Sequence, residues 1–132
     1  MKVRFIHIAI LTLVLLLSSC SSDDDGIDTS QVFGVWDRIE MSQNQTTLFR
    51  IVFGTNANAI KIDRTDFDDG TSLSSAGSYK WELIADDEVR LVNEANGDIL
   101  IFEINTNTSP PQLESETNTP LIKTSEDFTD FF

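Results

Sequence analysis

From Gln31 onward, the chain consists of short runs of alternating apolar and polar residues, separated by turn-forming residues. Strict alternation is typical of strands that bury one face. No heptad or long helical period interrupts the series. The runs predict six to eight short strands at Val32–Met41, Thr47–Phe53, Ala59–Arg64, Ser78–Ile84, Glu88–Asn93 and Asp98–Asn105, with weaker candidates at Gln112–Glu116 and Pro120–Thr124.

Most links between these runs are short, which favours antiparallel neighbours because parallel strands need long crossovers. Asn96-Gly97 lies between two runs and predicts a type I′ hairpin, in which both central residues have positive φ. Residues 65–77 are predicted as a longer loop. The series predicts an all-β fold, a small antiparallel up-and-down β-barrel of about eight short strands, because closure removes exposed strand edges.

One face of each strand is predicted to line the barrel interior. Most of these side chains are bulky, and small barrels with bulky interiors are packed rather than hollow. An enclosed space of about 300 Å³ or more would instead favour ligand binding. The predicted inward residues are Phe49, Ile51, Phe53, Ile60, Ile62, Tyr79, Trp81, Leu83, Val89, Leu91, Leu100, Phe102 and Ile104.

If a ligand enters the barrel, the candidate binding residues are the aromatic side chains of Tyr79, Trp81 and Phe102, with Arg50 or Arg64 near the rim. The alternative role of the three aromatics is simple core packing, which is the common fate of inward aromatic side chains in a small barrel.

The first residues of the chain predict a secretory signal peptide over residues 1–19. Lys2 and Arg4 precede an apolar run, Phe5–Leu17, that is shorter than the roughly 20 residues of a membrane-spanning helix. The sequence LSSC at Leu17–Cys20 resembles the lipobox of bacterial lipoproteins. That resemblance implies that Cys20 carries acyl chains and anchors the protein in a membrane. An ordinary secreted protein with an incidental cysteine is the alternative.

Residues 20–30 are interpreted as the lipidated cysteine and an acidic, extended tether. Cys20 is followed by two serines and Asp23–Asp25. This tract resembles the one that many Bacteroidota lipoproteins carry after the acylated cysteine, where it marks export to the cell surface. The resemblance implies an outer-membrane lipoprotein exposed at the cell surface.

The first strand carries Gly34-x-Trp36, and YKW and ILIFEI follow at Tyr79–Trp81 and Ile99–Ile104. In order and spacing, Val32–Thr124 resembles the small lipocalin-like domains of Bacteroidota lipoproteins. We assign residues 31–124 to this domain. Lipocalins place the tryptophan across the closed end of the barrel and a late arginine against it. Here the only cation after residue 90 is Lys123.

Composition excludes several classes of function. The chain has 22 Asp and Glu against 9 Lys and Arg, a formal net charge of −13. Such a charge repels phosphate backbones, so we expect no nucleic-acid partner. The only histidine, His7, lies in the signal segment, which removes Ser-His-Asp and Cys-His catalysis and His/Cys zinc sites from the mature protein. We expect no enzyme, no catalytic residues and no cofactor.

The acidic stretch Asp63–Gly70 is the one candidate for calcium, and it fails the EF-hand test. With Gly70 at loop position 6, positions 1 and 12 fall on Thr65 and Ala76 instead of Asp and Glu. We therefore expect a solvated turn and no metal site.

The tail, residues 125–132, is acidic with three phenylalanines and is open to three interpretations: a last strand, a short helix capping the barrel, or a partner-binding peptide. Two functions also remain open. One is the binding of a small apolar ligand inside the barrel, and the other is protein interaction or a structural role with a filled core.

Overall fold

Eight antiparallel strands close into a barrel in the order in which they occur along the chain. The structure is a computed structural model, and it describes residues 28–132. The all-β, up-and-down, lipocalin-like barrel predicted from the sequence is therefore confirmed. The elements are η1 (Thr29–Gln31), β1 (Gly34–Ser42), β2 (Gln45–Phe53), β3 (Asn58–Phe67), β4 (Ser72–Ala85), β5 (Glu88–Asn93), β6 (Ile99–Asn105), β7 (Gln112–Ser115), β8 (Asn118–Ser125) and η2 (Thr129–Phe131).

The predicted signal peptide, Cys20 and the Asp23–Asp25 tract lie outside the described residues. Within residues 28–132, no helix has the length and apolar character needed to cross a membrane.

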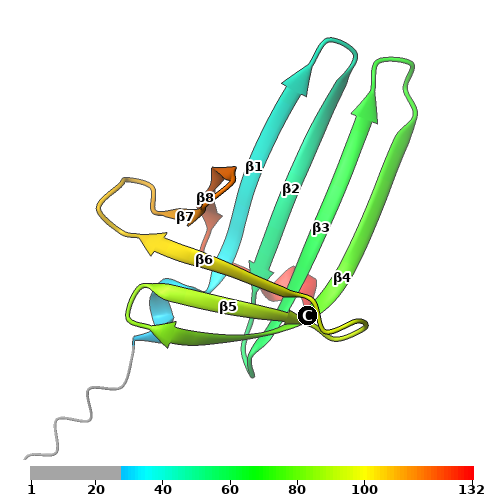
Figure 1. Ribbon diagram of the computed structural model, residues 1–132. Coiled ribbons are helices and arrows are strands. Elements are labelled where there is room, and N and C mark those ends of the chain that lie inside the picture. Colours follow the sequence, from blue (N-terminus) through cyan, green and yellow to red (C-terminus); the bar gives the residue numbers. More distant parts are fainter. Residues whose placement is uncertain (1–27) are drawn as a thin grey trace, which may run out of the picture.

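The strands differ greatly in length, from 14 residues in β4 to 4 in β7. Figure 1 shows the four long strands, β1–β4, running side by side and projecting past the shorter strands. The prediction of a loop at residues 65–77 is wrong, because β3 continues to Phe67 and β4 begins at Ser72. Both faces of this projecting sheet carry polar residues, so the apolar–polar alternation that reveals a half-buried strand is absent there.

Strand β3 turns polar side chains towards the barrel interior. Lys61 pairs directly with Ile51 of β2, and directly opposed residues share a face of the sheet. Lys61 and Asp63 therefore point inward, where they form an ion pair. The prediction that Ile60 and Ile62 point inward is wrong. Shifting β3 by one residue against β2 would exchange its inward and outward faces. The alternation of Ile60–Asp63 does not say which face is inward, and the pairing with β2 decides it.

The tight turn lies elsewhere than predicted. Between β5 and β6, only Gly97 has positive φ, at 78°, so Asn96-Gly97 does not form a type I′ turn. The N–H of Gly97 instead donates to the carbonyl of Asn93 at 2.9 Å, which makes a wider loop. Two consecutive left-handed residues occur between β2 and β3, at Asn56 (56°) and Ala57 (58°). Alanine gives no sequence signal for such a turn.

Barrel closure explains the glycine of the Gly-x-Trp pair. Strand β8 pairs with β1 at only three positions, with a register shift beside Val35. Gly34 has φ of 122°, and a Cβ there would collide with the carbonyl oxygen of Ser125. The absence of a side chain at residue 34 therefore lets the last strand approach the first.

Trp36 is fully buried where β8 meets β1. Its Nε1 donates to the carbonyl oxygen of Val32 at 2.9 Å. The Nζ of Lys123 lies 5.4 Å from the ring centroid of Trp36, within cation–π range. Lys123 also donates to the carbonyl oxygen of Gln31 at 3.1 Å and pairs with Glu126 at 2.9 Å. Lys123 therefore lies against the tryptophan, as the late arginine does in lipocalins.

Trp81 is also a core residue. Its ring makes edge-to-face contacts with Phe53 and Phe33, at centroid distances of 5.7 and 5.6 Å. Its Nε1 donates to the carbonyl oxygen of Gly54 at 3.1 Å. The buried indole N–H is thus satisfied, as a core position requires.

The C-terminal tail packs over the same aromatic cluster. Phe128 stacks on Phe33 at a centroid distance of 5.8 Å, and Phe132 lies so close to Gly54 that a Cβ there would clash with the ring. Of the three interpretations of the tail, the structure has a short helix, η2, packed against the barrel.

The strained turn generates a test of the fold. Replacing Ala57 with glycine relieves a left-handed conformation that costs an L-residue about 1–2 kcal/mol, offset by the greater freedom of glycine in the unfolded chain. We expect Ala57→Gly to stabilise the protein by roughly 0.5–1 kcal/mol, measured as a higher urea midpoint. The matched Ala59→Gly, at a buried position in the regular part of β3, should lower the midpoint. A lower midpoint for Ala57→Gly would contradict the turn.

Candidate functional site beside strand β6

The wall of the barrel is open beside the first half of β6. Strand β7 pairs only with residues 103–105 of β6. Residues 99–102 pair with β5 on one side, but no strand within the described residues pairs with them on the other. The first half of β6 is therefore a strand edge that faces the tip of the β7–β8 hairpin.

The direction of the free backbone groups follows from one hydrogen bond. The N–H of Ile104 donates to the carbonyl oxygen of Asp87, on the β5 side, at 2.6 Å. Backbone groups of successive residues in an antiparallel strand point to alternate sides. Ile99 and Ile101 therefore direct their N–H and C=O groups away from β5, into the opening.

The opening forms a groove of about 580 Å³. That volume is within the range of small-ligand sites. Its β6 wall is apolar, and the side chains of Ile99 and Ile101 are 55% and 49% exposed. The lining residues are Ile99, Leu100, Ile101 and Phe102 of β6, Ser115, Glu116, Thr117 and Asn118 of the hairpin, and Glu88 of β5.

Buried side chains occupy much of the barrel interior. A smaller cavity of about 110 Å³ shares Leu100, Phe102 and Asn118 with the groove. It is well below the roughly 300 Å³ of the smallest typical ligand pockets.

The cationic residues that line the small cavity already have partners. Arg38 donates to the carbonyl oxygen of Thr119 at 2.9 Å and lies 4.2 Å from the ring centroid of Phe49. Lys61 is paired with Asp63. An anionic head group in this cavity would have to compete with these contacts.

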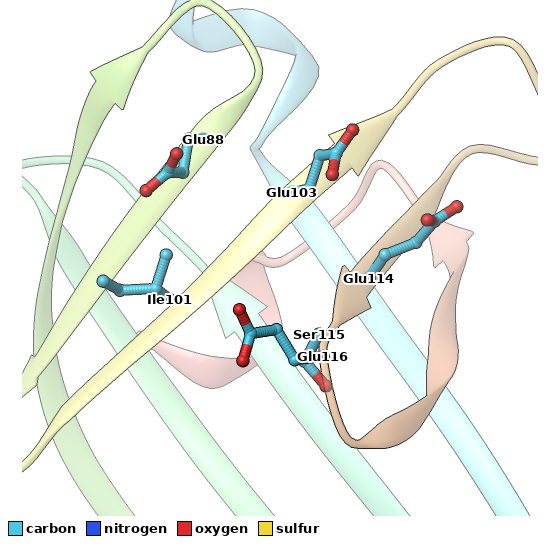
Figure 2. Close-up of a pocket in the computed structure, with 6 residues that line it drawn as sticks. All are labelled: Glu88, Ile101, Glu103, Glu114, Ser115 and Glu116. Atoms are coloured by element: carbon cyan, nitrogen blue, oxygen red, sulfur yellow. The ribbon is translucent and has the colours of Figure 1, made fainter.

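The outer rim of the groove is acidic. Glu103 of β6 lies directly opposite Glu88 of β5 and directly opposite Glu114 of β7, which makes a row of like charges across three strands. Figure 2 shows these carboxylates, together with Glu116 of the hairpin, around the side chain of Ile101. They line a hollow of about 370 Å³ that adjoins the groove. Like charges on directly opposed residues destabilise a sheet.

The aromatic candidates are separated. Phe102 lines both the groove and the small cavity. Trp81 packs against Phe33 and Phe53 and borders a different hollow, of about 360 Å³. Tyr79 belongs to the buried core and is 9% exposed. The structure does not bring the three into one cavity.

The two arginines considered for the rim make local ion pairs. Arg50 forms a two-point hydrogen bond with the carboxylate of Asp37, at 2.7 Å for each contact, which raises the pKa of Arg50. Arg50 also borders the small cavity. Arg64 pairs with Asp66 at 2.9 Å on the projecting sheet. Hydrogen bonds from Ser72 and Arg64 lower the pKa of Asp66.

The sequence interpretation missed the exposed isoleucines and the row of glutamates. One signal for the isoleucines was available. Residues 99–102 are all apolar, although a strand of an antiparallel barrel normally alternates between the core and solvent. The glutamate row leaves no sequence signal, because it depends on which residues of three strands are opposed.

No family model matches the chain, and the searches of curated proteins and of solved structures returned no match. Among residues 28–132, no group of three or more histidine, cysteine, aspartate or glutamate side chains is arranged to hold a metal ion.

The glutamate row leads to a prediction about stability. Neutralising its central member, Glu103→Gln, removes repulsion with both neighbours and should stabilise the protein by about 0.2–1 kcal/mol in low salt. Urea unfolding should show the gain shrinking in high salt, which screens exposed charges.

Glu82→Gln is the matched control, because Glu82 is ion-paired with Arg90 on the neighbouring strand. This change should leave stability the same or lower it. Equal effects of the two substitutions would mean that the glutamate row carries no particular strain.

Proposed function

We propose that this protein is a membrane-anchored, non-catalytic binding module that captures an extended segment of another protein at the opening beside β6. One observation carries the proposal: β6 presents unpaired backbone groups of Ile99 and Ile101 to a groove of about 580 Å³, whereas the cavity inside the barrel is only about 110 Å³. Extended peptides bind exposed sheet edges by adding a strand.

The groove specifies the chemistry of such a segment. Its backbone would pair with Ile99 and Ile101, and alternate side chains would point to opposite faces of the sheet. Side chains on the inner face would meet Leu100 and Phe102. Those on the outer face would meet Glu103 and its acidic neighbours. The preferred segment therefore alternates apolar and cationic residues.

The anchor and the location are part of the proposal. They rest on the apolar segment that ends at Cys20, on the resemblance of LSSC to a lipobox and on the acidic residues Asp23–Asp25. Together these features support a lipoprotein of the outer membrane that faces the cell exterior. The absence of catalysis rests on residue chemistry, since the sequence has no histidine after His7 and no cysteine besides Cys20.

A small apolar ligand is the second candidate. It is favoured by the apolar side chains of Leu100 and Phe102, which line both the groove and the small cavity. Such a ligand would occupy the groove with one end and enter the barrel only by displacing core side chains.

The anchor is tested at Cys20. In its native host, the unaltered protein should incorporate an alkyne-labelled fatty acid and fractionate with the outer membrane. Cys20→Ser should lose both properties, because the acylated thiol is removed. Replacing Asp23–Asp25 with alanines should leave the label but reduce cleavage by protease added to intact cells. Labelled Cys20→Ser protein would disprove anchoring at this residue.

The binding site is tested with two labelled synthetic peptides, one of alternating valine and lysine and one of alternating valine and glutamate. Fluorescence anisotropy should show saturable binding of the lysine peptide only. Ile101→Pro removes an N–H that faces the opening and leaves the β5 pairing intact. It should weaken binding by about tenfold or more, equivalent to about 1.4 kcal/mol.

Ile101→Val is the matched control, because it keeps both the N–H and an apolar side chain. If neither peptide binds, or if Ile101→Pro binds as tightly as Ile101→Val, strand addition is wrong. Saturable quenching of tryptophan fluorescence by oleate, abolished by Phe102→Ala, would favour the small-ligand alternative.

A further inference from the structure

We infer that the free edge of β4 pairs with the same edge of a second copy, so that two projecting sheets join into one. Strand β5 pairs with β4 only from Tyr79 onward. Residues 72–77 pair with β3 on one side, and no strand within residues 28–132 pairs with them on the other. Figure 1 shows this part of β4 at the margin of the projecting sheet.

Two hydrogen bonds establish which backbone groups are free. The N–H of Phe67 donates to the carbonyl oxygen of Thr71 at 2.9 Å. Backbone groups alternate between the two sides of a strand, so Thr71, Leu73, Ser75 and Gly77 point their N–H and C=O groups to β3. Ser72, Ser74 and Ala76 therefore point their N–H and C=O groups outward. Ser78 lies two residues after Ala76, so its backbone groups point to the same side. Its carbonyl oxygen accepts from the N–H of Glu94 on the β5 side, which agrees with this assignment.

This edge lacks the usual protection against pairing. Exposed edges are normally blocked by charged side chains, proline or bulges. Residues 71–79, TSLSSAGSY, contain no charged residue and no proline, and their pairing with β3 has no register shift. The other margin of the projecting sheet, on β1, carries Glu40 paired with Arg38.

A second copy fits this edge better than a charged partner does. Two copies of an acidic chain repel each other wherever their carboxylates come close. Residues 71–79 carry no carboxylate, so two copies can approach along this stretch. Antiparallel pairing about a two-fold axis through Ser74 places Ser74 opposite the partner's Ser74, and Ser72 opposite the partner's Ala76. Each such pair can exchange two backbone hydrogen bonds.

The side chains also permit the pairing. Leu73 is 67% exposed on the inner face. In the paired sheet, it would lie beside the partner's Ser75 and near the partner's Gly77. These small residues leave room for its side chain, so the contact would cover an apolar group that is otherwise in water. The shared patch is self-complementary, as a two-fold interface must be.

The test is disulfide trapping of full-length protein in its native membranes, with a mild oxidant and non-reducing electrophoresis. Cysteine Cα atoms must lie about 4.4–6.8 Å apart to bridge. Ser74→Cys should therefore form covalent dimers, because residue 74 meets its own copy. Ser72→Cys alone should not, because its counterpart lies several residues away. The double variant Ser72→Cys/Ala76→Cys should form dimers again.

A proline separates edge pairing from chance collision. The N–H of Ala76 faces outward, so Ala76→Pro breaks no hydrogen bond to β3. Added to Ser74→Cys, it should reduce trapping by at least about tenfold, and an unchanged tryptophan emission spectrum would show that the barrel is intact. The inference is overturned if Ser74→Cys forms no dimers, if Ser72→Cys forms them equally well, or if the proline has no effect on an intact barrel.

Discussion

The barrel depends on the contact that closes it. Strand β8 meets β1 at only three paired positions, and the approach is possible because Gly34 has no side chain where the carbonyl oxygen of Ser125 lies. Lys123 reinforces the contact through the ring of Trp36 and the carbonyl oxygen of Gln31. With so short a ladder, these few groups hold the two ends of the sheet together.

A short final hairpin also determines where the barrel is open. Strand β7 has 4 residues against 7 in its neighbour β6, so it cannot cover the full length of that strand. The first half of β6 therefore has no second partner within the described chain. The first half of β4 has none there because its other neighbour, β5, has only 6 residues against 14. Closure between β1 and β8 therefore does not remove every strand edge. Free edges remain beside the first half of β6 and along the first half of β4.

Sequence patterns predicted the barrel because its core strands alternate clearly. The predicted run Glu88–Asn93 matches the observed β5, and Trp36 and Trp81 are in the core. The pattern failed where tertiary contacts decide. Residues 72–77 form a strand although both faces are exposed, and Lys61 faces inward because β2 sets its register.

The candidate site could be predicted only in part, for a related reason. Phe102 was recognised as an inward aromatic, and it does line the groove. The groove itself exists because β7 pairs only with residues 103–105 of β6. The sequence of β6 gives no signal of where its neighbour ends. The row formed by Glu88, Glu103 and Glu114 likewise depends on pairings between three strands.

The acidic residues within the other described strands are all ion-paired, which makes the glutamate row informative. Asp37 is held by Arg50, Asp66 by Arg64 and Lys123 by Glu126. A sheet that pairs the acidic residues of its other strands would gain stability by doing the same beside β6. Rules of local stability are most often broken at functional sites. The glutamate row borders the groove into which the unpaired backbone groups of β6 point. One extended, cationic partner would therefore satisfy both these hydrogen-bonding groups and the negative charge of the row.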